Sequence, residues 1–288
     1  MENGVSEKVD MLKDWIKQQP HLPHKNNDVL LTRFIYCCNG SIEVAKKLID
    51  LFYSMRLQIP ELFSDRDPAH PDIDKAWQVM DLIPLPILTK DKYQLLVYRL
   101  NTSDADNFNF INAAKTFTMV ADVRMIQESS LSEGEVPIFD MKNFTIKHFT
   151  KFAFPIMRKQ AVYSQEALPI RLKQIHFVNA TSFFDKIMLL IRPVLKSEVV
   201  KMLHVHLPNS ETLFDFIPRD LLPEEYGGTI GSCEDLKKIW RTKMLDEREY
   251  FTNDEYWKVD ESKRPAGSDN SHSQYFGMQG SFKTLSID

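Results

Sequence analysis

The stretch "ATSFFDKIMLLIRPVL", from Ala180 to Leu195, is the most apolar part of this chain. A helix that spans a membrane needs about 18 consecutive apolar residues, but Asp185, Lys186 and Arg192 interrupt this run. At about 100° per residue, its large apolar side chains fall in one arc of roughly 160°, opposite the three charges. The stretch therefore predicts an amphipathic helix, which either packs permanently on a sheet or belongs to a cover that moves. The arc consists of Phe183, Phe184, Ile187, Met188, Leu190, Ile191, Val194 and Leu195.

Length and composition are those of an ordinary globular protein. Of the 288 residues, 43% are hydrophobic and 26% are charged, which allows one large domain or two unequal ones. The formal net charge of -4 argues against a nucleic-acid partner, because binding phosphates needs a basic surface. The N-terminal residues contain no apolar signal-peptide core, so we expect a cytoplasmic protein.

The first part of the chain has a helical pattern. Apolar residues recur at three- and four-residue spacings in "VDMLKDWIKQQ", "NDVLLTRFIYCC" and "SIEVAKKLIDLFYSMRLQ", which prolines and a glycine separate. These segments predict a three-helix N-terminal domain at residues 1–64. Prolines and aspartates in "DRDPAHPDID" then indicate a linker, so residues 65–84 are predicted to form a linker and a connecting helix.

Beyond the linker, predicted strands alternate with predicted helices. The strands are "PLPILT", "YQLLVYRL", "EVPIFDM", "IRLKQIHFVNA" and "MLHVHL", and helices are expected at 108–128, 145–165 and in the apolar stretch. This alternation implies crossover connections and predicts an α/β domain at residues 85–250, with a mostly parallel sheet flanked by helices. The Gly- and Ser-rich end predicts a C-terminal tail at 251–288, whose Tyr275, Phe276 and Phe282 could dock on the body.

The residues contain no catalytic constellation. There is no nucleophile elbow, phosphate loop or dinucleotide fingerprint, so we expect neither an enzyme nor a cofactor. His204 and His206 point to one side of a predicted strand, as a metal pair requires, but no third ligand accompanies them, so no metal is expected. What stands out is the content of 12 Met and 19 Phe, which either fill a core or line a cavity for an apolar ligand.

Three blocks of sequence resemble the CRAL-TRIO family of lipid-binding proteins. They are "IFDMKNFT", "FVNATSFFDKIMLLIRPVL" and "LPEEYGG", in the family's order and spacing, and "NDVLLTRFIYCCNGSIEVAKKLIDLFY" is similar to its N-terminal helical domain. The resemblance covers nearly the whole chain. It implies a three-helix bundle followed by a CRAL-TRIO domain, in which the helix matching Ala180 to Lys201 is a mobile gate over a deep apolar pocket.

The resemblance also implies which residues contact the ligand, and plain core packing is the alternative for each of them. Asp122 departs from an apolar wall, because a buried carboxylate needs a partner, a proton or a polar ligand end. The matching wall positions are Tyr98, Thr118, Met119, Asp122, Phe139, Tyr163, Leu168 and Ile175. On the gate, the matching positions Phe183, Ile187, Leu190, Ile191 and Leu195 share one inward helical face.

A further implication is transient contact with a membrane surface. Arg171 and Lys173 match two positions of the basic cluster in the family's phosphoinositide-binding members. Glu198, Met202 and Cys38 stand where those members have cations, so phosphoinositide selectivity is expected to be weakened.

By this resemblance, the protein is expected to be a cytosolic, monomeric carrier of a small lipophilic ligand. Tocopherol-, retinoid- and carotenoid-like molecules and other lipids are all compatible with an apolar pocket, from which the carrier transfers its ligand at membranes. The alternative is a lipid-sensing adaptor that regulates a protein partner and carries no cargo.

Overall fold

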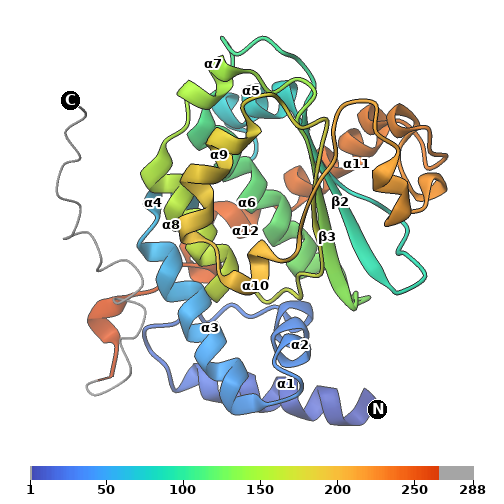
Figure 1. The fold of residues 1–288 in the computed structure, drawn as a ribbon. Helices are drawn as coiled ribbons and strands as arrows, with labels where there is room; N and C mark the ends of the chain where they lie inside the picture. Colours follow the sequence, from blue (N-terminus) through green and yellow to red (C-terminus); the bar gives the residue numbers. More distant parts are fainter. Residues whose placement is uncertain (1, 266–288) are drawn as a thin grey trace.

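The computed structural model describes residues 2–265. The chain begins with a helical domain of α1 (Glu2–Lys17), α2 (Asp28–Cys37) and α3 (Ile42–Leu57), as the sequence predicted (Figure 1). The side chains of Asn27 and Ser41 accept backbone N–H groups at the start of α2 and α3, which caps both helices. The domain's core is formed by the side chains of Leu12, Ile16, Leu31, Phe34, Ile49 and Phe52.

Two short helices lie between α3 and the sheet: the first falls in the range assigned to the N-terminal domain, and the second falls in 65–84, where a linker and a connecting helix were expected. Each of α4 (Pro60–Phe63) and α5 (Pro71–Val79) begins at a proline, which suits the first helical turn because proline has no N–H to leave unpaired. Strand β1 (Met80–Pro84) follows directly and pairs antiparallel with β2 (Tyr93–Leu100). The sheet therefore begins at Met80, inside the range assigned to the linker.

The sheet has five strands in the order β1-β2-β3-β4-β5. Strands β2, β3 (Gly134–Asp140), β4 (Ile175–Val178) and β5 (Leu203–Val205) are parallel, which confirms the predicted mostly parallel α/β fold. Three crossover connections join them. The first is α6 (Phe110–Gln127); the second contains α7 (Ile146–Thr150) and α8 (Phe154–Glu166); the third contains α9 (Phe184–Ile191), the 3-10 turn η1 (Arg192–Val194) and α10 (Ser197–Val200).

The crossover helices lie on one side of the sheet, and α11 (Cys233–Asp246) packs along the edge strand β1 and also contacts α6 (Figure 1). Strand register places Tyr98, Phe139 and Phe177 side by side on the face toward the crossovers. The opposite face carries His176, whose ring contacts Phe216 at 5.2 Å between centroids. Trp240 of α11 donates a hydrogen bond to Pro84 O at 2.9 Å.

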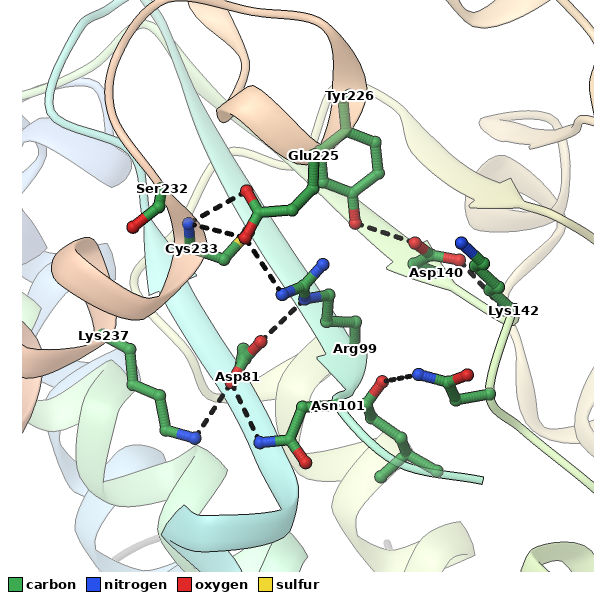
Figure 2. A network of polar contacts seen from close by, with 12 residues as sticks. Asp81, Arg99, Asn101, Asp140, Lys142, Glu225, Tyr226, Ser232, Cys233 and Lys237 are labelled. Atoms are coloured by element: carbon green, nitrogen blue, oxygen red, sulfur yellow. Dashed lines mark hydrogen bonds and ion pairs between the residues drawn. The ribbon is translucent and has the colours of Figure 1, made fainter. Parts of the chain in front are cut away.

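A polar network joins the "LPEEYGG" motif to the sheet (Figure 2). The Glu225 carboxylate accepts the Cys233 backbone N–H at 3.0 Å and pairs with Arg99 at 3.2 Å. Tyr226 donates its hydroxyl to Asp140 at 2.9 Å. A Cβ at Gly228 would lie 1.7 Å from the backbone O of Leu222, so only glycine fits there. The motif therefore has a structural role. It contains the 3-10 turn η4 (Glu224–Tyr226) and follows the turns η2 (Thr212–Asp215) and η3 (Arg219–Leu221).

The segment after α11 packs on the body as far as residue 265. It contains α12 (Arg248–Thr252), η5 (Asp254–Tyr256) and η6 (Glu261–Lys263), and Phe251, Trp257 and Val259 are buried. Arg264 donates two hydrogen bonds to the Asp50 carboxylate of α3, at 2.7 and 2.9 Å. This part of the expected tail thus belongs to the folded body. Tyr275, Phe276 and Phe282 lie outside the described residues.

Candidate ligand-binding site

A row of aromatic side chains crosses the sheet beneath the crossover helices. It runs from Phe117 of α6 through Tyr98, Phe139 and Phe177 on three adjacent strands to Phe184 of α9. Successive ring centroids are 4.9, 5.3, 5.3 and 5.0 Å apart. Side chains on one sheet face repeat every second residue, so the strand register alone assembles the three central rings. The row gives this face a continuous apolar surface that reaches under α9.

The crossover helices do not fully cover the aromatic row. Tyr98, Phe139 and Phe177 are only half-buried, whereas their neighbours Ile138 and His176, which point the other way, are buried. Burial raises the pKa of the Tyr98 hydroxyl. Among the described residues, that hydroxyl has no hydrogen-bond partner. An unpaired hydroxyl on a half-buried aromatic surface is the kind of group that orients a ligand in an apolar site.

The residues 184–200, comprising α9, η1 and α10, are called the α9 segment below. Phe184 and Ile187 are its buried residues, and they form a separate apolar cluster with Met141 and Ala180. Phe183 and Ile191 pack on the edge of that cluster. The apolar face of α9 therefore lies on the sheet side.

One predicted member of the inward face lies elsewhere. Leu190 is 49% exposed, and its neighbour Leu189 is 74% exposed. The prediction for Leu190 was therefore wrong, because the buried arc is centred between Ile187 and Phe184 and leaves Leu190 at its margin. Leu195 is half-buried and lies beyond Pro193, where η1 has ended the α-helical periodicity.

Two predicted wall residues face the N-terminal helices instead of the aromatic row. The Asp122 carboxylate accepts hydrogen bonds from Arg56 at 2.9 and 2.6 Å and from Arg66 at 2.5 Å, and all three side chains are buried. Tyr163 accepts a hydrogen bond from Arg56 Nε at 2.8 Å. The two arginines are the partners that a buried Asp122 requires, so no polar ligand end is needed there.

The other predicted wall residues divide between core and sheet face. Thr118 donates its hydroxyl to Lys115 O within α6, and Met119 is fully buried in the main core. Ile175 is half-buried on β4, on the same face as Phe177. Leu168, just after α8, is half-buried against the main core. Of the wall set, Tyr98, Phe139 and Ile175 are the ones brought together on the sheet face.

The two predicted membrane residues have different surroundings. Arg171 donates hydrogen bonds to Tyr36 O at 2.6 Å and Asn39 Oδ1 at 2.8 Å, and its guanidinium lies 3.9 Å from the centre of the Tyr36 ring. It therefore links the sheet domain to α2. Lys173 is exposed, and its Nζ lies 5.6 Å from the centre of the Tyr93 ring. Lys173 is thus the more available of the two cations for a membrane surface.

The histidines noted in the sequence form a stack with a third. His176 lies between His204 and His206, at 4.9 and 5.2 Å between centroids, and its Nδ1 is 2.9 Å from His206 Nε2. Burial, together with His206 and His204, lowers the pKa of His176 to about 3. Within residues 2–265, no group of three or more His, Cys, Asp or Glu residues is arranged to hold a metal ion.

A large open groove adjoins the Phe184 end of the aromatic row, since Met141 and Ala180 belong both to its lining and to the apolar cluster under α9. It has a volume of about 1030 Å³, and its lining mixes charged and polar residues such as Asp140, His206 and Arg219 with apolar ones such as Leu213 and Phe214. The charged part of this lining suits an apolar ligand less well than the aromatic row does, because charged groups stay hydrated. No helix among the described residues is long and apolar enough to cross a membrane.

Several residues of this site were not identified from the sequence. Phe117, Phe177 and Phe184 complete the aromatic row, and Gln165 of α8 contacts the α9 segment through Val194 and Lys196. The period of two along "IHFV" marks Phe177 as a partner of Ile175 on one face, so that residue could have been found. Nothing in the sequence pairs Gln165 with residues about thirty positions away.

Comparisons with known proteins agree with this architecture. A family model described as "CRAL/TRIO domain" matches residues 82–228, and one described as "Pinta-like, UBA domain" matches residues 1–73. Alpha-tocopherol transfer protein-like from Mus musculus is 25% identical over 247 residues, which cover 85% of this chain and 71% of that protein. Clavesin-2 from Homo sapiens is 25% identical over 261 residues, with 89% and 78% covered.

A solved structure supports the same fold. The "Crystal structure of Sfh5" superposes with a TM-score of 0.50 at 13% sequence identity, covering 85% of this chain and 97% of that one. At this level of identity, the similarity concerns the arrangement of helices and strands.

Proposed function

Because this chain belongs to the CRAL/TRIO domain family, whose members bind lipophilic ligands and transfer them, we propose that it carries a small lipophilic ligand between its aromatic sheet face and the α9 segment. The observation that supports this site most directly is the row from Phe117 to Phe184, whose central rings are only half-buried. A ligand in this space would cover apolar surface that the helices leave accessible.

In this proposal, Tyr98 sets the orientation of the ligand. Its hydroxyl is the unpaired polar group within the aromatic row, so it favours a ligand that carries one hydroxyl or carbonyl on an otherwise apolar body. Tocopherol-like and retinoid-like molecules have this form. The name of the relative from Mus musculus includes tocopherol transfer, which makes tocopherol the first ligand to test.

The α9 segment acts as the gate in the proposed cycle. Exposing Phe184 and Ile187 to water costs about 1.5–3 kcal/mol for each side chain, so the open form is rare in solution. At a membrane the same side chains contact acyl chains, and most of this cost disappears. Leu189 and Leu190 are already exposed on the outer surface of α9, where they provide a first apolar contact with lipid. Ligand exchange would then be coupled to transient membrane contact.

The experiment that tests this function is ligand transfer between two vesicle populations. Donor vesicles carry a fluorescent tocopherol, retinoid, sterol or phospholipid analogue, and acceptor vesicles carry a quencher. The full chain is added at a concentration far below that of the analogue. A carrier increases the transfer rate of at least one analogue in proportion to protein concentration. Saturable binding of an analogue without faster transfer would contradict carriage and favour the lipid-sensing adaptor.

A further inference from the structure

One side chain outside the α9 segment holds the backbone at the C-terminal end of that segment. Gln165, near the end of α8, donates from Nε2 to Val194 O at 3.0 Å and accepts the Lys196 N–H at Oε1 at 2.7 Å. The amide therefore binds the carbonyl and the N–H on either side of Leu195, as a neighbouring strand would. Two bonds from one planar group fix both the position and the direction of this part of the backbone.

The orientation of the Gln165 amide is determined by its partners. Its NH2 group also donates to Ala161 O of the same helix at 2.9 Å. Exchanging the amide oxygen and nitrogen would place the oxygen against two carbonyl oxygens and the NH2 group against the Lys196 N–H. Only one orientation of the amide satisfies all three bonds. The bond to Ala161 O lies within α8, so it holds the side chain in this orientation independently of the α9 segment.

The two ends of the α9 segment are held by different kinds of interaction. Near its N-terminal end, Phe184 and Ile187 are buried in an apolar cluster, whereas η1 and α10 contain no buried residue. Within the described part of the chain, the polar contacts that tie residues 192–200 to other elements come from α8. Besides the Gln165 bonds, they include the ion pair of Lys196 with Glu166 at 2.9 Å.

We propose that Gln165 is the latch that keeps the α9 segment closed, with the Lys196–Glu166 ion pair as its second contact. This inference rests on the proposed function, because a latch matters only if the segment opens. Hydrogen bonds that are half-buried or exposed suit this role, since water can replace them when the segment moves and no fully buried side chain has to be exposed at that end. Opening would then begin at residues 194–196 and proceed toward Phe184.

The functional test compares Gln165→Met with Gln160→Met. Methionine keeps the length of the side chain and removes all three bonds of the amide, including the two to the α9 segment. Gln160 is a half-buried residue of the same helix without a hydrogen bond to the α9 segment. Protein loaded with the fluorescent tocopherol analogue is mixed with neutral acceptor vesicles. We expect Gln165→Met to release the probe roughly tenfold faster, which corresponds to about 1.4 kcal/mol, and Gln160→Met to behave like the wild type. Equal release rates for the two variants would contradict the latch.

A second measurement does not depend on any ligand. Amide hydrogen exchange is followed by NMR at Lys196, whose N–H binds Gln165, and at Val200 and Lys201, whose N–H groups bond within α10. Faster exchange at all three amides in Gln165→Met means that the whole end of the segment opens, and this supports the latch. Faster exchange at Lys196 alone means that one bond was lost, and this overturns it. If the wild type transfers no analogue while all three amides respond, the carrier function fails and the latch stands.

Discussion

The guanidinium of Arg56 lies against the carboxylate of Asp122 with two hydrogen bonds of 2.9 and 2.6 Å, and both side chains are 1% exposed. Arg56 belongs to α3 of the N-terminal domain, and Asp122 belongs to α6 of the sheet domain. Arg66 also donates to Asp122, so a single carboxylate compensates two buried cations. The two domains are therefore joined by buried charge as well as by apolar contact, and neither side can lose its partner without leaving an uncompensated charge.

Asp122→Ala is expected to destabilise the protein by about 3–5 kcal/mol, because it leaves Arg56 and Arg66 buried without a counter-ion. Urea unfolding measures the change in the free energy of unfolding. Asp91→Ala is the matched control, since Asp91 is exposed in a turn. A loss below about 1 kcal/mol for Asp122→Ala would mean that the arginines find water or another partner.

Ile187→Asp is expected to impair ligand retention far more than Leu189→Asp, which introduces the same charge two positions away. Ile187 is buried toward the sheet, whereas Leu189 is 74% exposed. A carboxylate at position 187 costs several kcal/mol in an apolar environment unless it takes a proton. Thermal melts and binding of a fluorescent tocopherol analogue are measured together. Normal binding by Ile187→Asp would remove Ile187 from the site, and failure to fold would make α9 ordinary core.

Tyr98→Phe is expected to leave stability within about 0.5 kcal/mol of the wild type, because the hydroxyl has no partner among the described residues. Affinity for a ligand with a hydroxyl group should fall about threefold to tenfold, as for one hydrogen bond of roughly 0.5–1.5 kcal/mol. Titrations with tocopherol and with its methyl ether measure this effect. Equal losses for both ligands would show that the hydroxyl of Tyr98 does not contact the polar end of the ligand.

Lys173→Ala and Arg171→Ala are expected to have separate effects. Lys173→Ala should lower binding to phosphoinositide liposomes about fivefold, as for one cation worth about 1 kcal/mol near an anionic surface, without changing the melting temperature. Arg171→Ala should lower the melting temperature, because it removes the hydrogen bonds to Tyr36 and Asn39. Co-flotation at low and high salt is compared with Lys75→Ala, a lysine exposed on α5. Unchanged flotation of Lys173→Ala would place the membrane contact elsewhere.

The free energy of unfolding is expected to depend on pH through His176. The pKa of His176 is lowered from 6.5 to about 3 in the folded protein, so the unfolded chain takes up the proton first. The contribution of His176 to stability is therefore fully present above pH 6.5. It decreases as the pH falls toward 3, by at most about 1.4 kcal/mol per pH unit. Urea unfolding between pH 7 and about 4.5 should show a smaller slope for His176→Gln than for the wild type. Equal slopes for the two proteins would mean that other groups cause the pH dependence of the free energy of unfolding.

The sequence by itself determined the class of the fold and the kind of protein. Helical spacing in the first 60 residues and alternating strands and helices after Met80 predict the two parts of the chain, because period and burial are local properties of a segment. The stretch from Ala180 to Leu195 likewise carries its amphipathic character in its own spacing. The motif "LPEEYGG" also depends on local geometry. Gly227 has a positive φ, and a Cβ at Gly228 would clash with the nearby backbone.

Only the tertiary structure decided which of the expected site residues lie together. Asp122 and Tyr163 are on helices whose sequence does not say which neighbour they face, and their partner Arg56 lies 66 and 107 residues away along the chain. Leu190 and Phe184 are both apolar on α9, and the position of the sheet selects Phe184 for burial. Gln165 meets Val194 and Lys196 because α8 and η1 pack side by side. Partner choice over such distances depends on how preformed elements dock, which no local pattern records.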